Sequence, residues 1–154
     1  MFDPLFSKIL VAFDGSEPSK RALDCAAKTA AMFKGELVII TVVPKASFPI
    51  LVEEGSTPFR AREYEVYQER MKESFRSSLE RAEADVIERY PGLKYEAVLL
   101  EGRPSSTIVE EAKRRDVNLI MMGSRGLGGI AGWILGSTSR KVVDQCTKPI
   151  LIVK

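Results

Sequence analysis

Short apolar runs alternate along the chain with segments of helical periodicity. The runs occupy residues 9–13, 37–43, 95–100, 119–122 and 150–153, and we interpret each of them as a β-strand. The run at 37–43 is apolar at nearly every position. Such a run is typical of a strand that is covered on both faces, as strands of parallel sheets are.

The segments between the runs carry helix signals. After the first run, Ser16 is suited to cap a helix that has Pro18 in its first turn and Gly35 as its C-terminal stop. Two shorter helices are expected, one after residues 102–106 and one over residues 137–146. Residues 45–62 show no clean period, so we predict a long loop there.

The longest helix is predicted over residues 63–90. Its apolar side chains recur every three or four positions, with Glu and Arg on the other face. We interpret this apolar stripe as core packing and not as a binding feature; it comprises Tyr64, Tyr67, Met71, Phe75, Leu79, Ala82, Val86 and Tyr90.

The strict alternation of strand and helix determines the expected fold class. With right-handed crossovers it gives an open parallel sheet covered by helices on both faces. We therefore predict an α/β fold: a single-domain, Rossmann-like, open parallel five-stranded sheet, with residues 1–154 forming one domain.

Composition narrows the function classes. The net charge is +2 with no block of like charge, so there is no electrostatic footprint for nucleic acid or an anionic membrane. No apolar stretch approaches the ~20 residues of a membrane helix, and no signal peptide is evident, so we expect a cytoplasmic protein. Histidine is absent, which excludes Ser-His-Asp triads and Cys-His dyads. We interpret the widely separated Cys25 and Cys146 as small buried hydrophobes in a reducing compartment.

Candidate chemistry concentrates in the glycine-rich stretch from Gly123 to Gly136. Ligands of such sheets bind beyond the carboxyl ends of the strands, where the strand order reverses. Glycines let a backbone approach a ligand and turn its amides toward an anion, and the helix start at 136–139 favours a phosphate. The pattern therefore predicts two phosphate half-sites joined by nine residues. A flexible surface loop capped by Ser137 would explain the same residues.

Two better-known phosphate motifs do not describe this stretch. No Lys-Ser or Lys-Thr pair follows the last glycine, so it is not a P-loop. It also follows the fourth strand instead of the first, and it lacks the third glycine of the dinucleotide fingerprint.

The spacing of this stretch resembles a family signature. The pattern Gly-x2-Gly-x9-Gly-[Ser/Thr] is met by Gly123, Gly126, Gly136 and Ser137, and it is similar to the ATP-binding signature of the universal stress protein family. The resemblance extends over the whole chain. It includes residues 14–16, 41–42, 122–126 and 148–153, each in the place where that family has them.

The resemblance implies an adenine nucleotide as ligand: ATP, or alternatively AMP or ADP. Ala12 and Phe13 would line the base pocket, Asp14 would contact the ribose or the adenine edge, and the backbone of Val42 would meet adenine. The ribose and phosphates would be surrounded by Met122, Gly123, Arg125, Gly126, Gly136, Ser137, Thr138 and Ser139. Mg²⁺ or Mn²⁺ would be held through phosphate oxygens.

The resemblance also implies a homodimer that forms through the last strand. Residues 150–153 would otherwise leave an apolar sheet edge exposed. We expect neither nucleic acid nor a membrane as partner.

Several of these residues have simpler explanations. Asp14 can belong to a turn and a helix cap, and Arg125 can be a solvated loop cation. Phe13 suits a core position, and the side chain of Val42 belongs in the core under either interpretation. Trp133 is better explained by packing of the glycine-rich loop, or contact with a partner subunit, than by stacking on adenine.

Four functions are weighed on this basis. The first is a stress-response regulatory dimer that binds ATP. The second is an ATPase, expected to be slow because no P-loop lysine follows the glycines and no carboxylate besides Asp14 is evident near the site. The third is a nucleotide-independent stress or assembly factor, against which the full glycine signature argues. The fourth is an adenylate-forming transferase. Such an enzyme would have a glycine-rich loop after the first strand, and residues 13–16 do not match that loop.

Overall fold

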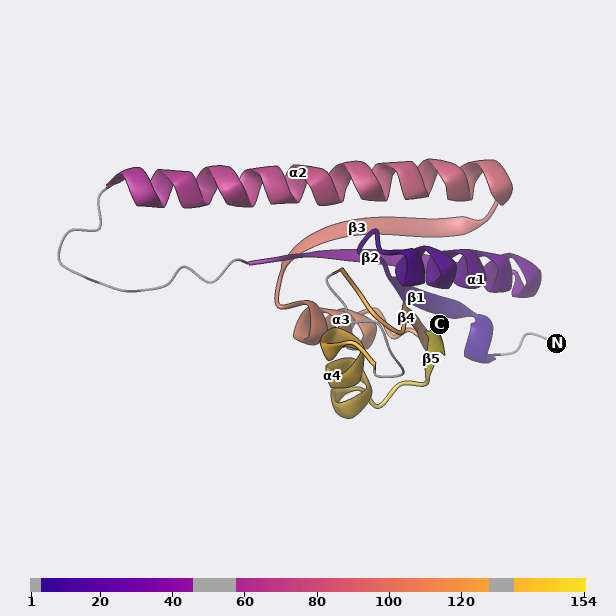
Figure 1. Ribbon diagram of the computed structural model, residues 1–154. Helices are drawn as coiled ribbons and strands as arrows, with labels where there is room; N and C mark the ends of the chain where they lie inside the picture. The colour runs from indigo at the N-terminus through magenta and orange to yellow at the C-terminus, as the bar shows by residue number, and fades with distance from the viewer. Residues whose placement is uncertain (1–3, 46–57, 128–134) are drawn as a thin grey trace.

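The computed structural model describes residues 4–45, 58–127 and 135–154 (Figure 1). A short 3₁₀ helix, η1 (Pro4–Phe6), precedes a regular alternation of strands and helices. The elements are β1 (Lys8–Ala12), α1 (Glu17–Phe33), β2 (Glu36–Pro44), α2 (Pro58–Arg89), β3 (Lys94–Gly102), α3 (Pro104–Arg114), β4 (Leu119–Gly123), α4 (Ser137–Gln145) and β5 (Ile150–Val153). The predicted order of strands and helices is confirmed.

The five strands form one sheet in the order β3-β2-β1-β4-β5, and every pair is parallel. Leu10 in the central strand β1 pairs with Val38 of β2 on one side and Ile120 of β4 on the other. From β1 the chain builds outward through β2 and β3, and it then returns to place β4 and β5 on the opposite side. The strand order therefore reverses between β1 and β4, and the predicted open parallel sheet is confirmed.

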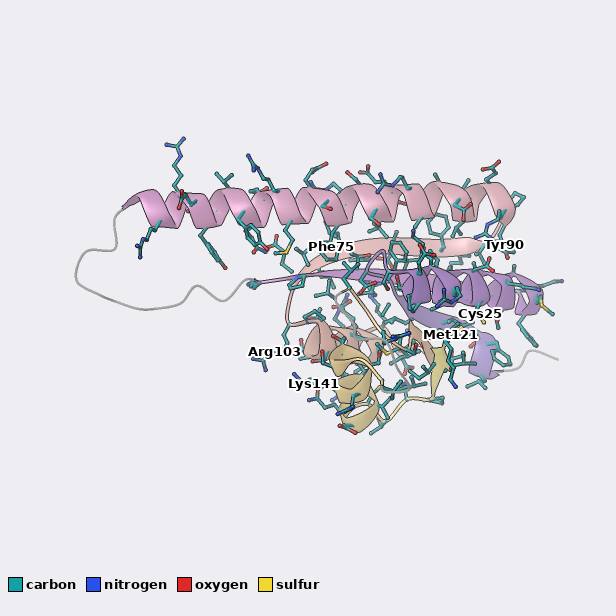
Figure 2. All side chains as sticks on the ribbon, viewed as in Figure 1. Cys25, Phe75, Tyr90, Arg103, Met121 and Lys141 are labelled. Atoms are coloured by element: carbon teal, nitrogen blue, oxygen red, sulfur yellow. The ribbon has the colours of Figure 1, made fainter. Side chains whose placement is uncertain are left out.

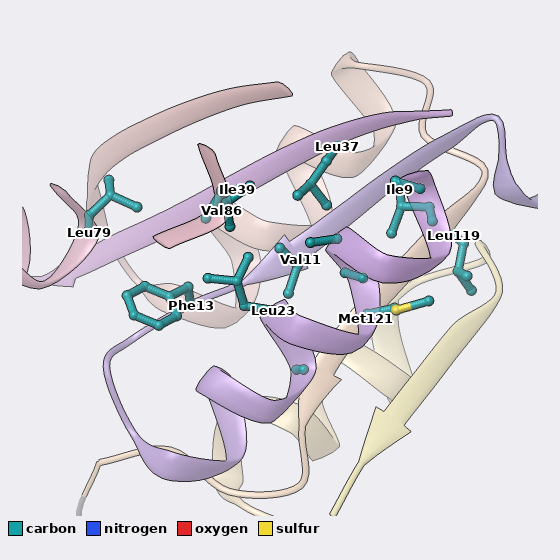
Figure 3. Close-up of a cluster of buried hydrophobic side chains, with 14 residues drawn as sticks. Ile9, Val11, Phe13, Leu23, Leu37, Ile39, Leu79, Val86, Leu119 and Met121 are labelled. Carbon is teal, nitrogen blue, oxygen red and sulfur yellow. The ribbon is translucent and has the colours of Figure 1, made fainter. Parts of the chain in front are cut away.

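Helices cover both faces of the sheet, as predicted. On one face α1 and α2 enclose a core that contains Val11, Phe13, Leu23 and Leu79 (Figure 3). On the other face α3 and α4 enclose a second core; it contains Leu10, Val38, Ile40, Ile108, Ile120 and Val142. The nearly continuous apolar run 37–43 in β2 is buried at all seven of its positions, because helices pack on both sides of it.

The ends of α1 show which of its predicted signals were correct. Ser16 is the N-cap, and its hydroxyl accepts a hydrogen bond from the Ser19 amide, as expected. At the C-terminal end, however, the left-handed residue is Lys34, with φ of 53°, and not Gly35. Gly35 is required for a different reason. A Cβ at this position would lie 2.1 Å from the carbonyl oxygen of Phe6, so a side chain would collide with η1.

Helix α2 differs most from its prediction. It begins at Pro58, five residues before the predicted start at Glu63, so part of the predicted loop is helical. The prediction for residues 46–57 lies outside the described residues. With 32 residues α2 is ~48 Å long, whereas a nine-residue strand spans ~30 Å. Its N-terminal turns therefore extend beyond the sheet (Figure 1).

The apolar stripe of α2 is consequently only partly a core feature. Leu79 and Val86 are buried in the core, and Ala82 and Tyr90 pack against it. Tyr67 is 59% exposed, because no part of the sheet lies beneath the first turns of the helix. The interpretation of the whole stripe as core is therefore wrong for its N-terminal part.

The two cysteines lie on opposite faces of the sheet. Cys25 and Cys146 are free thiols, half-buried, each packed against a different one of the two cores. Within the described ranges, no helix is both long and apolar enough to span a membrane.

Replacement of Leu79 tests how α2 is held on the sheet. Leu79→Ala should lower the free energy of unfolding by about 2–5 kcal/mol, because it leaves a cavity in the first core. Tyr67→Ala, in the overhanging N-terminal turns, should change the free energy of unfolding by less than about 0.5 kcal/mol. Urea denaturation followed by circular dichroism measures both. Equal losses of unfolding free energy in the two variants would contradict the division of α2 into a packed part and overhanging N-terminal turns.

Candidate functional site

A cleft of about 230 Å³ lies at the carboxyl edge of the sheet, at the point where the strand order reverses. Ten of the twelve predicted site residues line it: Ala12, Asp14, Met122, Gly123, Arg125, Gly126, Gly136, Ser137, Thr138 and Ser139. The cleft thus brings together two segments that are separated by more than a hundred residues in the sequence. Phe13 and Val42 are not among the lining residues.

Asp14 connects these two segments directly. Its Oδ1 accepts a hydrogen bond from the Ser16 amide at 2.9 Å, which closes the turn before α1. Its Oδ2 accepts a hydrogen bond from the amide of Leu127 at 3.0 Å. The turn-and-cap explanation of Asp14 is therefore correct, but it is incomplete, because the same carboxylate also holds the glycine-rich segment.

The two predicted phosphate half-sites are adjacent in space. The amide of Gly136 donates a 2.7 Å hydrogen bond to the carbonyl oxygen of Ser124. The hydroxyl of Ser139 is buried and donates a 2.8 Å hydrogen bond to the carbonyl oxygen of Gly123. These two bonds fix the start of α4 against the end of β4. The chain segments on either side of the nine-residue connection therefore form one continuous wall of the cleft.

The start of α4 supplies anion-binding groups to this wall. Gly136 is the N-cap, so the amides of Ser137, Thr138 and Ser139 occupy the first turn, where a helix offers no internal acceptors. Unpaired amides and the positive end of the helix dipole favour a bound anion there. Because the Ser139 hydroxyl is already bonded to Gly123, Ser139 can offer an anion only its backbone amide.

Close packing accounts for two of the signature glycines. A Cβ on Gly123 would lie 2.7 Å from the backbone carbonyl carbon of Pro18 and 2.9 Å from the Ser19 nitrogen, so the end of β4 contacts the first turn of α1. A Cβ on Gly126 would lie 2.5 Å from the carboxylate oxygen Oδ2 of Asp14. Gly123 is thus required by the contact between the end of β4 and α1, independently of any ligand, whereas the atom that opposes Gly126 is the end of a side chain.

Phe13 and Val42 are placed in the cores instead of the cleft. Phe13 is only 3% exposed and packs in the first core, while its backbone bonds to β2 through the Ile40 carbonyl and the Thr41 hydroxyl. Val42 is 7% exposed and packs in the second core. The expected contribution of Phe13 to a base pocket therefore does not agree with the position of its side chain. The core explanation holds for both side chains.

Six further residues line the cleft and were not predicted: Ser19, Pro44, Phe75, Pro104, Ile108 and Leu127. Pro44 ends β2 and Pro104 begins the helix after β3, so both follow the carboxyl ends of strands. Sheet topology alone could have indicated them. Phe75 carried no separate signal, because it lies on the apolar stripe of α2.

Three contacts bring α2 to this edge of the sheet. Nε2 of Gln68 donates a hydrogen bond to the Pro44 carbonyl oxygen at 3.2 Å. Nζ of Lys72 lies 2.5 Å from Oε1 of Glu101 near the end of β3. Their hydrogen bond raises the pKa of Lys72 and lowers the pKa of Glu101, so both groups are charged at neutral pH. Nearly two turns after Lys72, Ser78 packs so closely on the β1–α1 turn that a Cβ on Gly15 would lie 2.7 Å from its hydroxyl oxygen.

Sheet topology and the glycine-lined cleft together define a Rossmann-like α/β protein whose cleft lies at the switch point of the sheet, where ligands of such folds bind. Comparison with known proteins gives the family. A sequence model of the Universal stress protein family matches residues 5–154. The universal stress protein YxiE of Bacillus subtilis is 34% identical, over 97% of this chain and 100% of its own length.

Solved structures agree with this assignment. Universal stress protein UspA from Lactobacillus plantarum has a TM-score of 0.83 at 20% identity, and the match covers 97% of this chain and 98% of that one. A universal stress protein solved in complex with cAMP has a TM-score of 0.63 at 27% identity, and the match covers 96% and 95% of the two chains. The chain belongs to the Universal stress protein family.

Substitution of Gly123 tests the close contact between β4 and α1. Gly123→Ala should lower the free energy of unfolding by about 1–3 kcal/mol, since the added methyl group would press on helix backbone that cannot move aside. Gly126→Ala should cost less, because the Asp14 carboxylate can rotate away from it. Thermal unfolding measures both, with Ser137→Ala at an exposed position as the control. A Gly123→Ala variant as stable as the parent would contradict this packing.

Proposed function

We propose that the cleft binds an adenine nucleotide, with ATP as the leading candidate and AMP and ADP as alternatives. The observation that carries the proposal is that a glycine-lined turn and the α4 N-terminus meet in one wall of the cleft, and that Asp14 is hydrogen-bonded to the same glycine-rich segment. In this arrangement the wall would hold the phosphates of a nucleotide, and Asp14 would hold its ribose. The proposal is supported by the similar universal stress protein that was solved in complex with cAMP, because cAMP is itself an adenine nucleotide.

The phosphates would bind where the wall offers amide donors. Ser137 and Thr138 in the first turn of α4 supply backbone amides and hydroxyls, and Gly126 lets the backbone approach without a side chain. Arg125 also lines the cleft and adds a positive charge near this wall. A phosphate chain in this position would replace water on these donors.

Asp14 would accept hydrogen bonds from the ribose hydroxyls. An ionised carboxylate has about four acceptor positions, and the amides of Ser16 and Leu127 occupy two of them. The remaining lone pairs are available to a ligand in the cleft, which Asp14 lines. Binding of a ribose there would leave both backbone hydrogen bonds in place.

A divalent cation, Mg²⁺ or Mn²⁺, would be held chiefly by the phosphates themselves. Among the described residues, no group of three or more Asp, Glu, Cys or His side chains converges to hold a metal ion. Mg²⁺ in nucleotide sites commonly keeps several waters and binds substrate phosphates together with one or two protein oxygens. Ser137 and Thr138 line the cleft, and their hydroxyl oxygens would be available to such a cation.

Calorimetry with ATP and magnesium tests the proposed binding. The parent should bind ATP, and Gly136→Val should weaken binding at least about tenfold (~1.4 kcal/mol). A Cβ there would already lie 3.2 Å from the Arg125 Cα and 3.6 Å from the Gly126 nitrogen, so the valine methyl groups would enter the space between the half-sites. Gln145→Val, exposed at the far end of α4, is the control.

The absence of any heat with ATP, ADP or AMP would contradict the proposed function. Equal binding by the parent and by Gly136→Val would contradict the proposed position of the phosphates. Mass spectrometry of the nucleotide that copurifies with the parent would distinguish ATP from ADP and AMP.

We also propose that the protein acts as a homodimer that forms through β5. Among the described strands, β5 lies at the edge of the sheet and pairs with β4 alone. Leu151 in its middle is 39% exposed, although it is a large apolar side chain. An edge strand with unpaired backbone groups and an exposed leucine favours pairing with another strand. A second copy of β5 would satisfy both.

A charge on this strand tests the dimer. Leu151→Lys should give a monomer, because a buried lysine at the interface would lose its hydration, and lysine on an edge strand opposes pairing. Sedimentation velocity on the parent and the variant measures the change. Val66→Lys, at an exposed apolar position on α2, should leave the dimer intact. A parent that sediments as a monomer would refute the proposal.

A further inference from the structure

The cleft has both polar and apolar lining residues. The polar groups belong chiefly to the glycine-lined turn and the α4 N-terminus described above. The apolar lining residues come from five different elements and have no side-chain N–H, O–H or carbonyl group: Ala12, Pro44, Phe75, Pro104, Ile108 and Met122. Phe75 is the only aromatic side chain among the described lining residues.

Phe75 is the only contribution of α2 to the described cleft lining. The helix is fixed over this edge on both sides of it, by the Gln68 and Lys72 contacts before it and by the packing of Ser78 on the β1–α1 turn after it. Figure 2 shows Phe75 on the side of α2 that faces the sheet. Its position is therefore determined by the tertiary structure and not by a flexible loop.

The packing of Phe75 differs from that of its neighbours on the stripe. Leu79, one turn later, is 6% exposed and belongs to the first core. Phe75 is only half-buried, and it belongs neither to the two core clusters nor to the residues that pack against them. A large aromatic ring thus lies at the cleft with apolar surface that the described core does not use.

We propose that Phe75 is the residue that contacts the base of the bound nucleotide, so that α2 forms part of the ligand site. This inference rests on the proposed function. A purine ring is planar and aromatic, and it stacks or packs edge-to-face on a phenylalanine ring. The other apolar lining residues have no aromatic face, so Phe75 selects for ligands that carry an aromatic base over those that carry only phosphates and sugar.

Binding measurements with and without a base test this role. By calorimetry, Phe75→Ala should weaken ATP binding about tenfold. It should leave the affinity for inorganic tripolyphosphate, which has no base, unchanged. Phe75→Tyr should bind ATP like the parent, because it retains the aromatic face, and Phe75→Leu should lie between. Tyr67→Ala removes an exposed aromatic side chain two turns earlier on the same helix and should change neither affinity.

Each alternative outcome has a distinct meaning. If the parent binds none of ATP, ADP and AMP, the proposed function fails and the role of Phe75 fails with it. If the parent binds ATP and Phe75→Ala binds it equally well, only the role of Phe75 is refuted. If Phe75→Ala loses ATP and tripolyphosphate to the same extent, Phe75 shapes the whole cleft and does not contact the base. Thermal unfolding of each variant confirms that it is folded under the binding conditions.

Discussion

The pairing of β1 with β4 is the interaction on which the rest of the structure depends. Ala12 and Met122 form its last paired position. Beyond it β1 has ended, whereas β4 continues for one more residue, Gly123, beside β5. The chain after β1 enters α1 on the face of the first core, and the chain after β4 leads to α4 on the face of the second. A space must open between two chains that diverge in this way. The cleft occupies that space.

Among the described residues, the sides of the cleft are joined by hydrogen bonds that involve backbone groups. The carboxylate of Asp14 joins the loop after β1 to the Leu127 amide, and Ser124 and Gly136 join the end of β4 to the start of α4. These contacts require that no side chain intervene at Gly123 and Gly126. The glycine spacing in the sequence therefore reflects two constraints at once: contact between the loops and open access to backbone amides. A sequence alone does not separate the two.

Much of the fold could be predicted because each strand ends at a recognisable turn residue or helix cap, as at Ser16. The errors have local physical causes. Ala12 and Phe13 were both expected at a base pocket, but successive residues of an extended chain point to opposite faces. Ala12 consequently lines the cleft, while Phe13 packs in the core. Periodicity also identifies the apolar face of α2 without indicating what covers it, so the exposure of Tyr67 could not be read from the pattern.

The same stripe of α2 therefore meets three different surroundings along one rigid helix. Its C-terminal part is fixed in the core by Leu79 and Val86, and its N-terminal part, with Tyr67, extends beyond the sheet. Phe75 lies between them, at the cleft. Because an α-helix bends little over a few turns, the core contacts of Leu79 and Val86 determine where the backbone of Phe75 lies. A ligand that moved this backbone would also move the overhanging N-terminal turns, or else strain the packing of Leu79.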